Sequence, residues 1–253
     1  MLPMFFKRGL NFLRFQFHQK LRWSRPGYQE IPLGDVSKFD LSIQPYIQKR
    51  QSMYNVTFEK RISLENARDN YFYFDLLQTS RTRWNWTTNS TRVLDVGSKN
   101  FYYADALENF FKPQFLTGIE VDGYTIYSDV HSRKDYADYY LKPYSNAEYI
   151  IADFLKFNGK FDVITCFYPF VFPETATLWC LPLSFFDPTA FFKKIESLLE
   201  KDSFFWMLNH GEEEWIEAQA LLTKTNLKCI GHFSEKNPLS SCDEIACVSL
   251  WKK

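Results

Sequence analysis

From residue 91 to the end of the chain, short apolar runs alternate with stretches in which apolar residues recur every three or four positions. Runs of this length predict buried strands, and the wider spacing predicts amphipathic helices. The expected strands are 92–97, 115–121, 147–154, 160–167, 202–209, 227–234 and 244–251. The expected helices are 101–111, 132–142, 187–200 and 212–225. Such alternation is typical of an α/β domain whose mostly parallel sheet is covered on both faces.

The last two expected strands differ from the others, because only the short segment "EKNPLSSCD" joins them. A parallel pair needs a crossover of about a dozen residues or more, so this connection indicates an antiparallel pair. We therefore predict a doubly wound, seven-stranded sheet with an antiparallel last strand over residues 81–253. An N-terminal helical extension or cap is expected over residues 1–80.

The N-terminal extension begins with a candidate amphipathic helix in residues 1–25. Its apolar residues share one helix face: Phe6, Leu10, Leu13, Phe17 and Leu21. Its positive charges are Lys7, Arg8, Arg14, Lys20, Arg22 and Arg25, and no acidic residue precedes Glu30. The proline- and glycine-containing residues 24–45 read as a linker, followed by helical residues 46–80.

Three kinds of partner fit the apolar face of residues 1–25. The favoured one is the protein itself, near residues 46–80, where Tyr71, Phe74 and Leu77 present a complementary stripe. Another is anionic lipid, which an amphipathic basic helix binds peripherally. The third is a partner protein or nucleic acid.

Composition narrows the environment and the partners. Thirty basic residues balance 30 acidic ones, so no overall charge attracts nucleic acid, and no nucleic-acid partner is expected. The five cysteines form no C-x-x-C pair, so we expect reduced thiols rather than a disulfide framework or a metal site. A cytoplasmic protein is expected, with possible peripheral membrane contact through residues 1–25.

Acidic residues follow the first three expected strands, where ligands of doubly wound sheets bind. They are Asp95 in "LDVGSKN", Glu120 in "GIEVD" and Asp153 in "IADF". An ionised Glu120 can accept two hydroxyl donors, and Gly97 lets a ligand approach the backbone closely. Asp153 can accept from an amine while Phe154 packs on a flat ring. The alternative is structural, since an acid at a strand end often caps a helix.

This order of acids, together with the reversed last strand, resembles the class I S-adenosylmethionine-dependent methyltransferases over residues 91–253. The resemblance implies a Rossmann-like fold and S-adenosyl-L-methionine as methyl donor. It implies that the turn after the first strand, with Asp95 and Gly97, wraps the methionine part. It further implies that Glu120 holds the ribose hydroxyls and Asp153 the adenine amine.

The chain departs from the family's D-x-G-x-G motif, because Lys99 stands where the second glycine is expected. One outcome is a rearranged but working turn, in which Ser98 and Asn100 bond the cofactor; the other is lost binding. The retained acids favour the first. The helix expected to begin near Phe101 would direct free N–H groups at the methionine carboxylate.

The segments after the fourth and fifth strands carry the candidate catalytic residues. Tyr168, in "CFYPFVFPE", is expected to orient the acceptor, and His210 is the candidate base. The alternative for "NHGEEEW" is a helix start with acids in its first turn. Aromatic residues of 167–186 are expected to roof the pocket. Methyl transfer from a sulfonium needs no metal.

The predicted function is thus methyl transfer to an unidentified acceptor, taken to be a small molecule. The alternative is a catalytically inactive methyltransferase fold that serves as an interaction or membrane-surface scaffold module.

Overall fold

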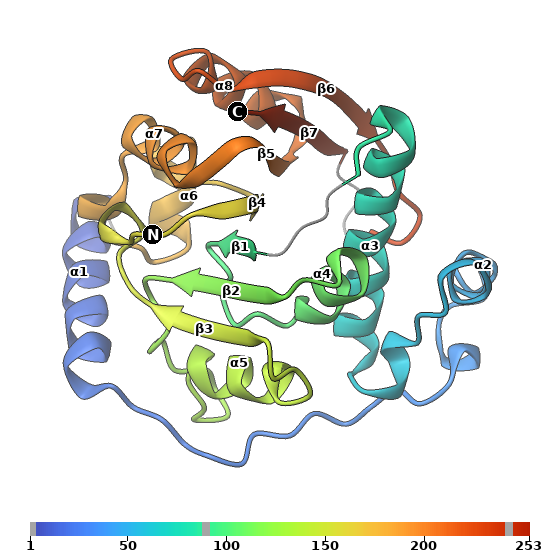
Figure 1. Ribbon diagram of the computed structural model, residues 1–253. Coiled ribbons are helices and arrows are strands. Elements are labelled where there is room, and N and C mark those ends of the chain that lie inside the picture. The colour runs from blue at the N-terminus through green and yellow to red at the C-terminus, as the bar shows by residue number, and fades with distance from the viewer. Residues whose placement is uncertain (1–3, 88–91, 241–244) are drawn as a thin grey trace.

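The computed structural model describes residues 4–87, 92–240 and 245–253, and Figure 1 shows its layers. One seven-stranded sheet has the strand order β3-β2-β1-β4-β5-β7-β6. The strands are β1 (Arg92–Val96), β2 (Phe115–Glu120), β3 (Ala147–Ile151), β4 (Phe161–Phe167), β5 (Leu199–His210), β6 (Lys228–Glu235) and β7 (Ala246–Lys252). Each expected strand is present, with ends shifted by a few residues.

The reversed last strand is confirmed. β7 pairs antiparallel with β5, with Met207 opposite Ser249, and antiparallel with β6, with Phe233 opposite Val248. The remaining neighbours pair in parallel. Their carboxyl ends therefore lie along one edge of the sheet, which is where a doubly wound fold places its ligand.

Helices cover both faces of the sheet, as predicted. They are α3 (Leu64–Trp84), α4 (Ala104–Phe111), α5 (Arg133–Leu141), α7 (Pro188–Leu198) and α8 (Gly211–Leu222). Successive side chains of β1 point to opposite faces of the sheet. Val93 belongs to the apolar cluster under α3, α4 and α5, and Leu94 belongs to the apolar cluster under α7 and α8. The shorter helices are α2 (Gln44–Tyr54) and α6 (Pro173–Leu178).

Helix α3 runs across the division expected between residues 80 and 81. Its side chains Tyr71, Phe74 and Leu77 are buried in the cluster that covers the sheet. The C-terminal part of the expected extension is therefore part of the α/β core.

Helix α1 (Met4–Leu21) docks through a different face from the one its apolar periodicity indicated. Asn11, Phe15 and His18 are buried, whereas Leu10, Leu13, Phe17 and Leu21 are 47–65% exposed. The expectation that residues 46–80 cover that apolar face is wrong. Figure 1 shows α1 at the left edge, by the ends of β2 and β3, with α3 on the opposite side.

Polar contacts explain this docking. The Asn11 amide donates to the Thr177 carbonyl at 3.0 Å, and the Gln19 amide donates to the Val121 carbonyl at 2.8 Å. Phe15 packs on Phe185 with ring centroids 4.9 Å apart. Among the described residues, none of the helices is both long enough and apolar enough to cross a membrane.

Candidate active site

A cavity of about 380 Å³ lies at the carboxyl ends of β1 to β5. Its volume is within the range of about 300–1,000 Å³ that small-molecule sites occupy. Six of the nine residues predicted from the sequence line it: Gly97, Glu120, Asp153, Phe154, Tyr168 and His210. The other three are Asp95, Ser98 and Asn100, and they do not line it.

The turn after β1 holds a left-handed conformation at three residues, with φ of +79° at Gly97, +54° at Lys99 and +56° at Phe101. Lys99 therefore takes a conformation that glycine adopts more easily. The turn is tied to β2, because the Gly97 N–H donates to the Ile119 carbonyl at 2.9 Å. Below it, a Cβ on Gly118 would stand 2.6 Å from the Phe101 ring, so the glycine lets this ring pack.

Asp95 supports this turn from behind. Its carboxylate is fully buried and accepts hydrogen bonds of 2.7 Å from the Tyr103 hydroxyl and from the Thr165 hydroxyl. Burial raises the pKa of Asp95 to about 6. The Ser98 hydroxyl donates to the Asp95 carbonyl at 2.9 Å. Asp95, Ser98 and Asn100 do not line the cavity, and their binding of a cofactor stays a prediction.

The start of α4 is also arranged differently from the expectation. The helix begins at Ala104 rather than near Phe101, and Asn70 of α3 lies against its first turn. The Asn70 side chain accepts from the Ala106 N–H at 2.9 Å and donates to the Tyr102 carbonyl at 2.9 Å. Asn70 therefore occupies one N–H group of this helix end, and the binding of the methionine carboxylate there stays a prediction.

Glu120 ends β2 with its carboxylate on the cavity wall. One oxygen accepts from the Lys99 N–H and the other from the Asp122 N–H, both at 2.9 Å. These bonds fix the carboxylate, and each ionised oxygen keeps a further lone pair for a hydroxyl donor.

Arg133 was missed by the sequence analysis. It lies on the cavity wall, with its Nη1 3.7 Å from Glu120 Oε1 and 3.8 Å from Asp122 Oδ2. Burial alone would lower the pKa of Arg133, but the neighbouring negative charges, Glu120 first, raise it overall. The sequence feature that could have pointed to Arg133 is a cation at the first residue of a helix, where the helix dipole disfavours positive charge.

Asp153 has the structural role that the sequence offered as its alternative. Its Oδ1 accepts from the Leu155 N–H at 3.0 Å and so caps a short 3-10 turn. Its Oδ2 lies 3.1 Å from the Lys156 ammonium. The residue also lines the cavity beside Phe154, and its binding of an amine stays a prediction.

The Lys99 side chain extends into an aromatic part of the cavity. Its Nζ lies 4.9 Å from the Trp179 ring centroid and 5.8 Å from that of Tyr102. Burial, followed by the positive charge of Arg133, lowers the pKa of this ammonium. The contacts are of the cation–π kind, so this pocket region favours a positive group.

Tyr168 and His210 meet at the ends of β4 and β5. Their rings are stacked, with centroids 3.6 Å apart and an angle of 9° between the planes. The Tyr168 N–H donates to the Leu208 carbonyl at 2.7 Å, although Tyr168 has a φ of +60°. The His210 N–H donates to Glu214 at 2.9 Å, so the helix start predicted as an alternative is present as well.

Two further segments close the cavity. Helix α3 contributes Asp69, Phe72 and Tyr73, and the Tyr102 hydroxyl donates to Asp69 at 3.1 Å. The aromatic segment 167–186 contributes six rings: Phe167, Tyr168, Phe170, Trp179, Phe185 and Phe186. The expected aromatic roof is therefore present. The acids on the lining, Asp69, Glu120, Asp122, Asp153 and Asp187, outnumber the two basic residues Lys99 and Arg133.

No protein-family model and no curated protein matches the chain. Solved structures do match it at low sequence identity. The N-methyltransferase NodS from Bradyrhizobium japonicum, in complex with S-adenosyl-L-homocysteine, is 14% identical with a TM-score of 0.52, over 73% of this chain and 87% of that one.

Two other solved structures match to a similar extent. Magnesium protoporphyrin IX methyltransferase from Synechocystis, with bound S-adenosylmethionine, is 9% identical with a TM-score of 0.50, over 82% of this chain and 91% of that one. A putative RNA methyltransferase from Pyrococcus horikoshii is 12% identical with a TM-score of 0.50, over 72% of this chain and 84% of that one. The chain therefore has the Rossmann-like fold of class I S-adenosylmethionine-dependent methyltransferases.

Proposed function

We propose that the protein is an S-adenosylmethionine-dependent methyltransferase that acts on a small molecule. The observation that carries the proposal is Glu120, whose carboxylate ends β2, lines the cavity and is fixed by the N–H groups of Lys99 and Asp122. A carboxylate held in this way presents acceptors to a pair of hydroxyl groups, as in a ribose. Structures with this fold and these ligands supply further support.

The cavity residues fit the proposed cofactor. Glu120 would hold the ribose, and Asp153 with Phe154 would hold the adenine through its amine and its ring face. Gly97 would let the cofactor approach the backbone, since a Cβ there would meet nothing within 4 Å. The excess of acids and the many aromatic rings suit a sulfonium cation. When bound, the cofactor supplies the activated methyl group.

The chain's own residues would position the acceptor and manage its proton. His210, stacked on Tyr168 at the cavity wall, is the proposed base for an acceptor that must lose a proton. Tyr168 would orient the acceptor, and the rings of segment 167–186 would exclude water. The acid-rich lining favours a small acceptor over RNA, because acids repel a phosphate backbone.

One observation favours the second candidate, an inactive methyltransferase fold that serves as a scaffold. Lys99 replaces the expected glycine, and its ammonium already occupies an aromatic part of the cavity. A fixed cation there opposes a sulfonium by like-charge repulsion. The retained Glu120 and Asp153, both on the cavity wall, are the reason that we place the enzyme first.

A thermal-shift titration separates the two candidates, because a ligand that binds the folded state raises its stability. The enzyme proposal predicts a rising melting temperature with S-adenosylmethionine and with S-adenosylhomocysteine, and a smaller rise with adenine alone at equal concentration, because adenine lacks the ribose that Glu120 would hold. An unchanged melting temperature with both ligands would contradict the proposed function and favour the scaffold.

A further inference from the structure

The outer face of α1 is an apolar surface. We define the α1 face by the side chains Leu10, Leu13, Phe17 and Leu21, each at least 47% exposed. Their spacing of three and four residues places them on one side of the helix. An apolar stripe of this kind on a helix normally packs against another element, and the protein leaves it open to solvent.

Positive charges border the α1 face. Arg14 and Lys20 are exposed on either side of the apolar stripe, and Arg22 and Arg25 are exposed just beyond the helix. No acidic residue occurs before Glu30, although the whole chain is neutral. The charge of this region therefore differs from that of the rest of the protein, and it is complementary to an anionic surface.

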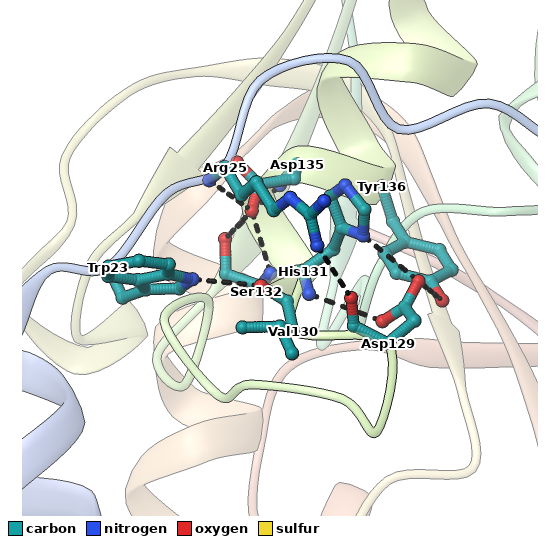
Figure 2. A network of polar contacts seen from close by, with 8 residues as sticks. All are labelled: Trp23, Arg25, Asp129, Val130, His131, Ser132, Asp135 and Tyr136. Carbon is teal, nitrogen blue, oxygen red and sulfur yellow. Dashed lines mark hydrogen bonds and ion pairs between the residues drawn. The ribbon is translucent and has the colours of Figure 1, made fainter.

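The opposite side of α1 fixes the helix to the domain. His18 Nδ1 lies 3.2 Å from the Thr125 hydroxyl, and the Gln19 amide donates to the Val121 carbonyl. Figure 2 shows the contacts that follow the helix, where the Trp23 indole donates to the Val130 carbonyl at 2.8 Å and the Arg25 N–H donates to Asp135 at 2.9 Å. With these bonds made, the α1 face points outward.

We propose that α1 docks flat on an anionic lipid bilayer. The α1 face enters the boundary between headgroups and acyl chains, while Lys20 reaches the lipid phosphates and Arg14, whose Nη1 lies 4.0 Å from Cys180 Sγ, adds positive charge beside them. Trp23, partly exposed at the end of the helix, suits the interface as well. The docked helix would hold α6, which forms part of the cavity wall through Thr175, beside the membrane.

Lipid fits the α1 face better than a second copy of this chain does. An antiparallel pairing of two α1 faces would bring the same cations of both copies together without any acid in residues 1–29 to neutralise them. An anionic bilayer supplies the opposite charge and the apolar phase at once.

The test is co-sedimentation of the full chain with vesicles of phosphatidylcholine alone and with vesicles that also contain phosphatidylserine. We expect binding to the anionic vesicles that falls when salt is raised from about 0.1 M to about 1 M, because the screening length drops from about 10 Å to about 3 Å. The double variant L13E/F17E should weaken the vesicle partition coefficient about a hundredfold, since two apolar side chains are lost.

The matched control is I31E/L41E, which adds the same charge at two apolar side chains that are 87% and 84% exposed outside α1. It should bind like the unmodified chain, and both variants should keep their thermal unfolding transition. Three results would overturn the proposal: no sedimentation with anionic vesicles, equal binding by L13E/F17E, or a salt-stable dimer that L13E/F17E dissociates without any vesicle binding.

Discussion

The Tyr103 hydroxyl donates a 2.7 Å hydrogen bond to the Asp95 carboxylate, so the first acid of the methyltransferase-like pattern stands behind the cavity wall. Tyr103 itself lines the cavity, whereas Asp95 does not. A second hydrogen bond, from Thr165 of β4, ties the same carboxylate to the neighbouring strand. Asp95 therefore shapes the turn through its neighbours, and its protonation state affects how firmly the turn is held.

Asp95 should make stability depend on pH between about 4 and 6. Its ordinary pKa is 3.8 and burial raises the folded value to about 6, so the folded chain keeps the proton longer than the unfolded chain does. Stability from this group is present below pH 4 and is lost as the pH rises through 6. Relative to Asp95→Asn, the unmodified chain should therefore lose up to about 3 kcal/mol of unfolding free energy as the pH rises across this window.

Urea denaturation at several pH values measures this difference, and other titrating groups cancel between the two proteins. A constant difference from pH 4 to pH 7 would show that Asp95 titrates near its ordinary value in the folded state.

Asn70 should be a major contributor to stability, because its side chain serves two backbone groups at the start of α4. Asn70→Ala leaves the buried Ala106 N–H and the Tyr102 carbonyl without these partners. We expect a loss of about 2–4 kcal/mol in the free energy of unfolding. Asn109→Ala, which removes one partly buried bond to the Asp105 carbonyl, should cost less than about 1 kcal/mol. Equal losses in chemical denaturation would refute this role.

Truncation of Phe15 and of Phe17, two residues apart in α1, should change stability by very different amounts. Phe15 is buried against Phe185, whereas Phe17 is exposed. In buffer without lipid, Phe15→Ala should lower the unfolding free energy by about 2–3 kcal/mol, and Phe17→Ala should change it by less than about 0.5 kcal/mol. The reverse order in a denaturation experiment would mean that α1 docks through the face its sequence periodicity first indicated.

The strands, the helices α4, α5, α7 and α8 and the reversed β7 could be predicted from the sequence, because each depends on local periodicity and on connection length, whereas the short helix α6 was not predicted. The face by which α1 docks could not. Leu13 and Phe17 carry the apolar signal, but Asn11 and Gln19 make the contacts, and their partners are carbonyls more than 100 residues away.

The residues of the candidate site also differ in how far the sequence alone could place them. Glu120 and Asp153 could be placed from strand ends alone, since parallel strands finish at one edge. Asp95 occupies a similar position in sequence, yet Tyr103 and Thr165 bond it inside the fold. Asp69 and Arg133 reach the cavity from helices whose packing no local pattern specifies.

Lys99 should reduce the preference for S-adenosylmethionine over S-adenosylhomocysteine, because its ammonium repels a sulfonium but not a neutral thioether. Lys99→Met should raise the ratio of the two association constants by about two- to fivefold, equivalent to about 0.5–1 kcal/mol. Lys99→Arg keeps the charge and should leave the ratio near that of the unmodified chain. Equal ratios in all three proteins, measured by calorimetry, would mean that the ammonium lies away from the bound sulfur.

The most direct test of the central claim is calorimetric binding of S-adenosylhomocysteine to the unmodified chain, to Glu120→Gln and to Glu148→Gln. Glu148 is an exposed carboxylate on the neighbouring strand β3, bonded to Thr117 at 3.0 Å and outside the cavity lining, so it controls for lost charge. We predict that Glu120→Gln weakens binding by about 1.5–3 kcal/mol and that Glu148→Gln leaves it unchanged. No binding by the unmodified chain, or equal binding by a folded Glu120→Gln, would contradict the account.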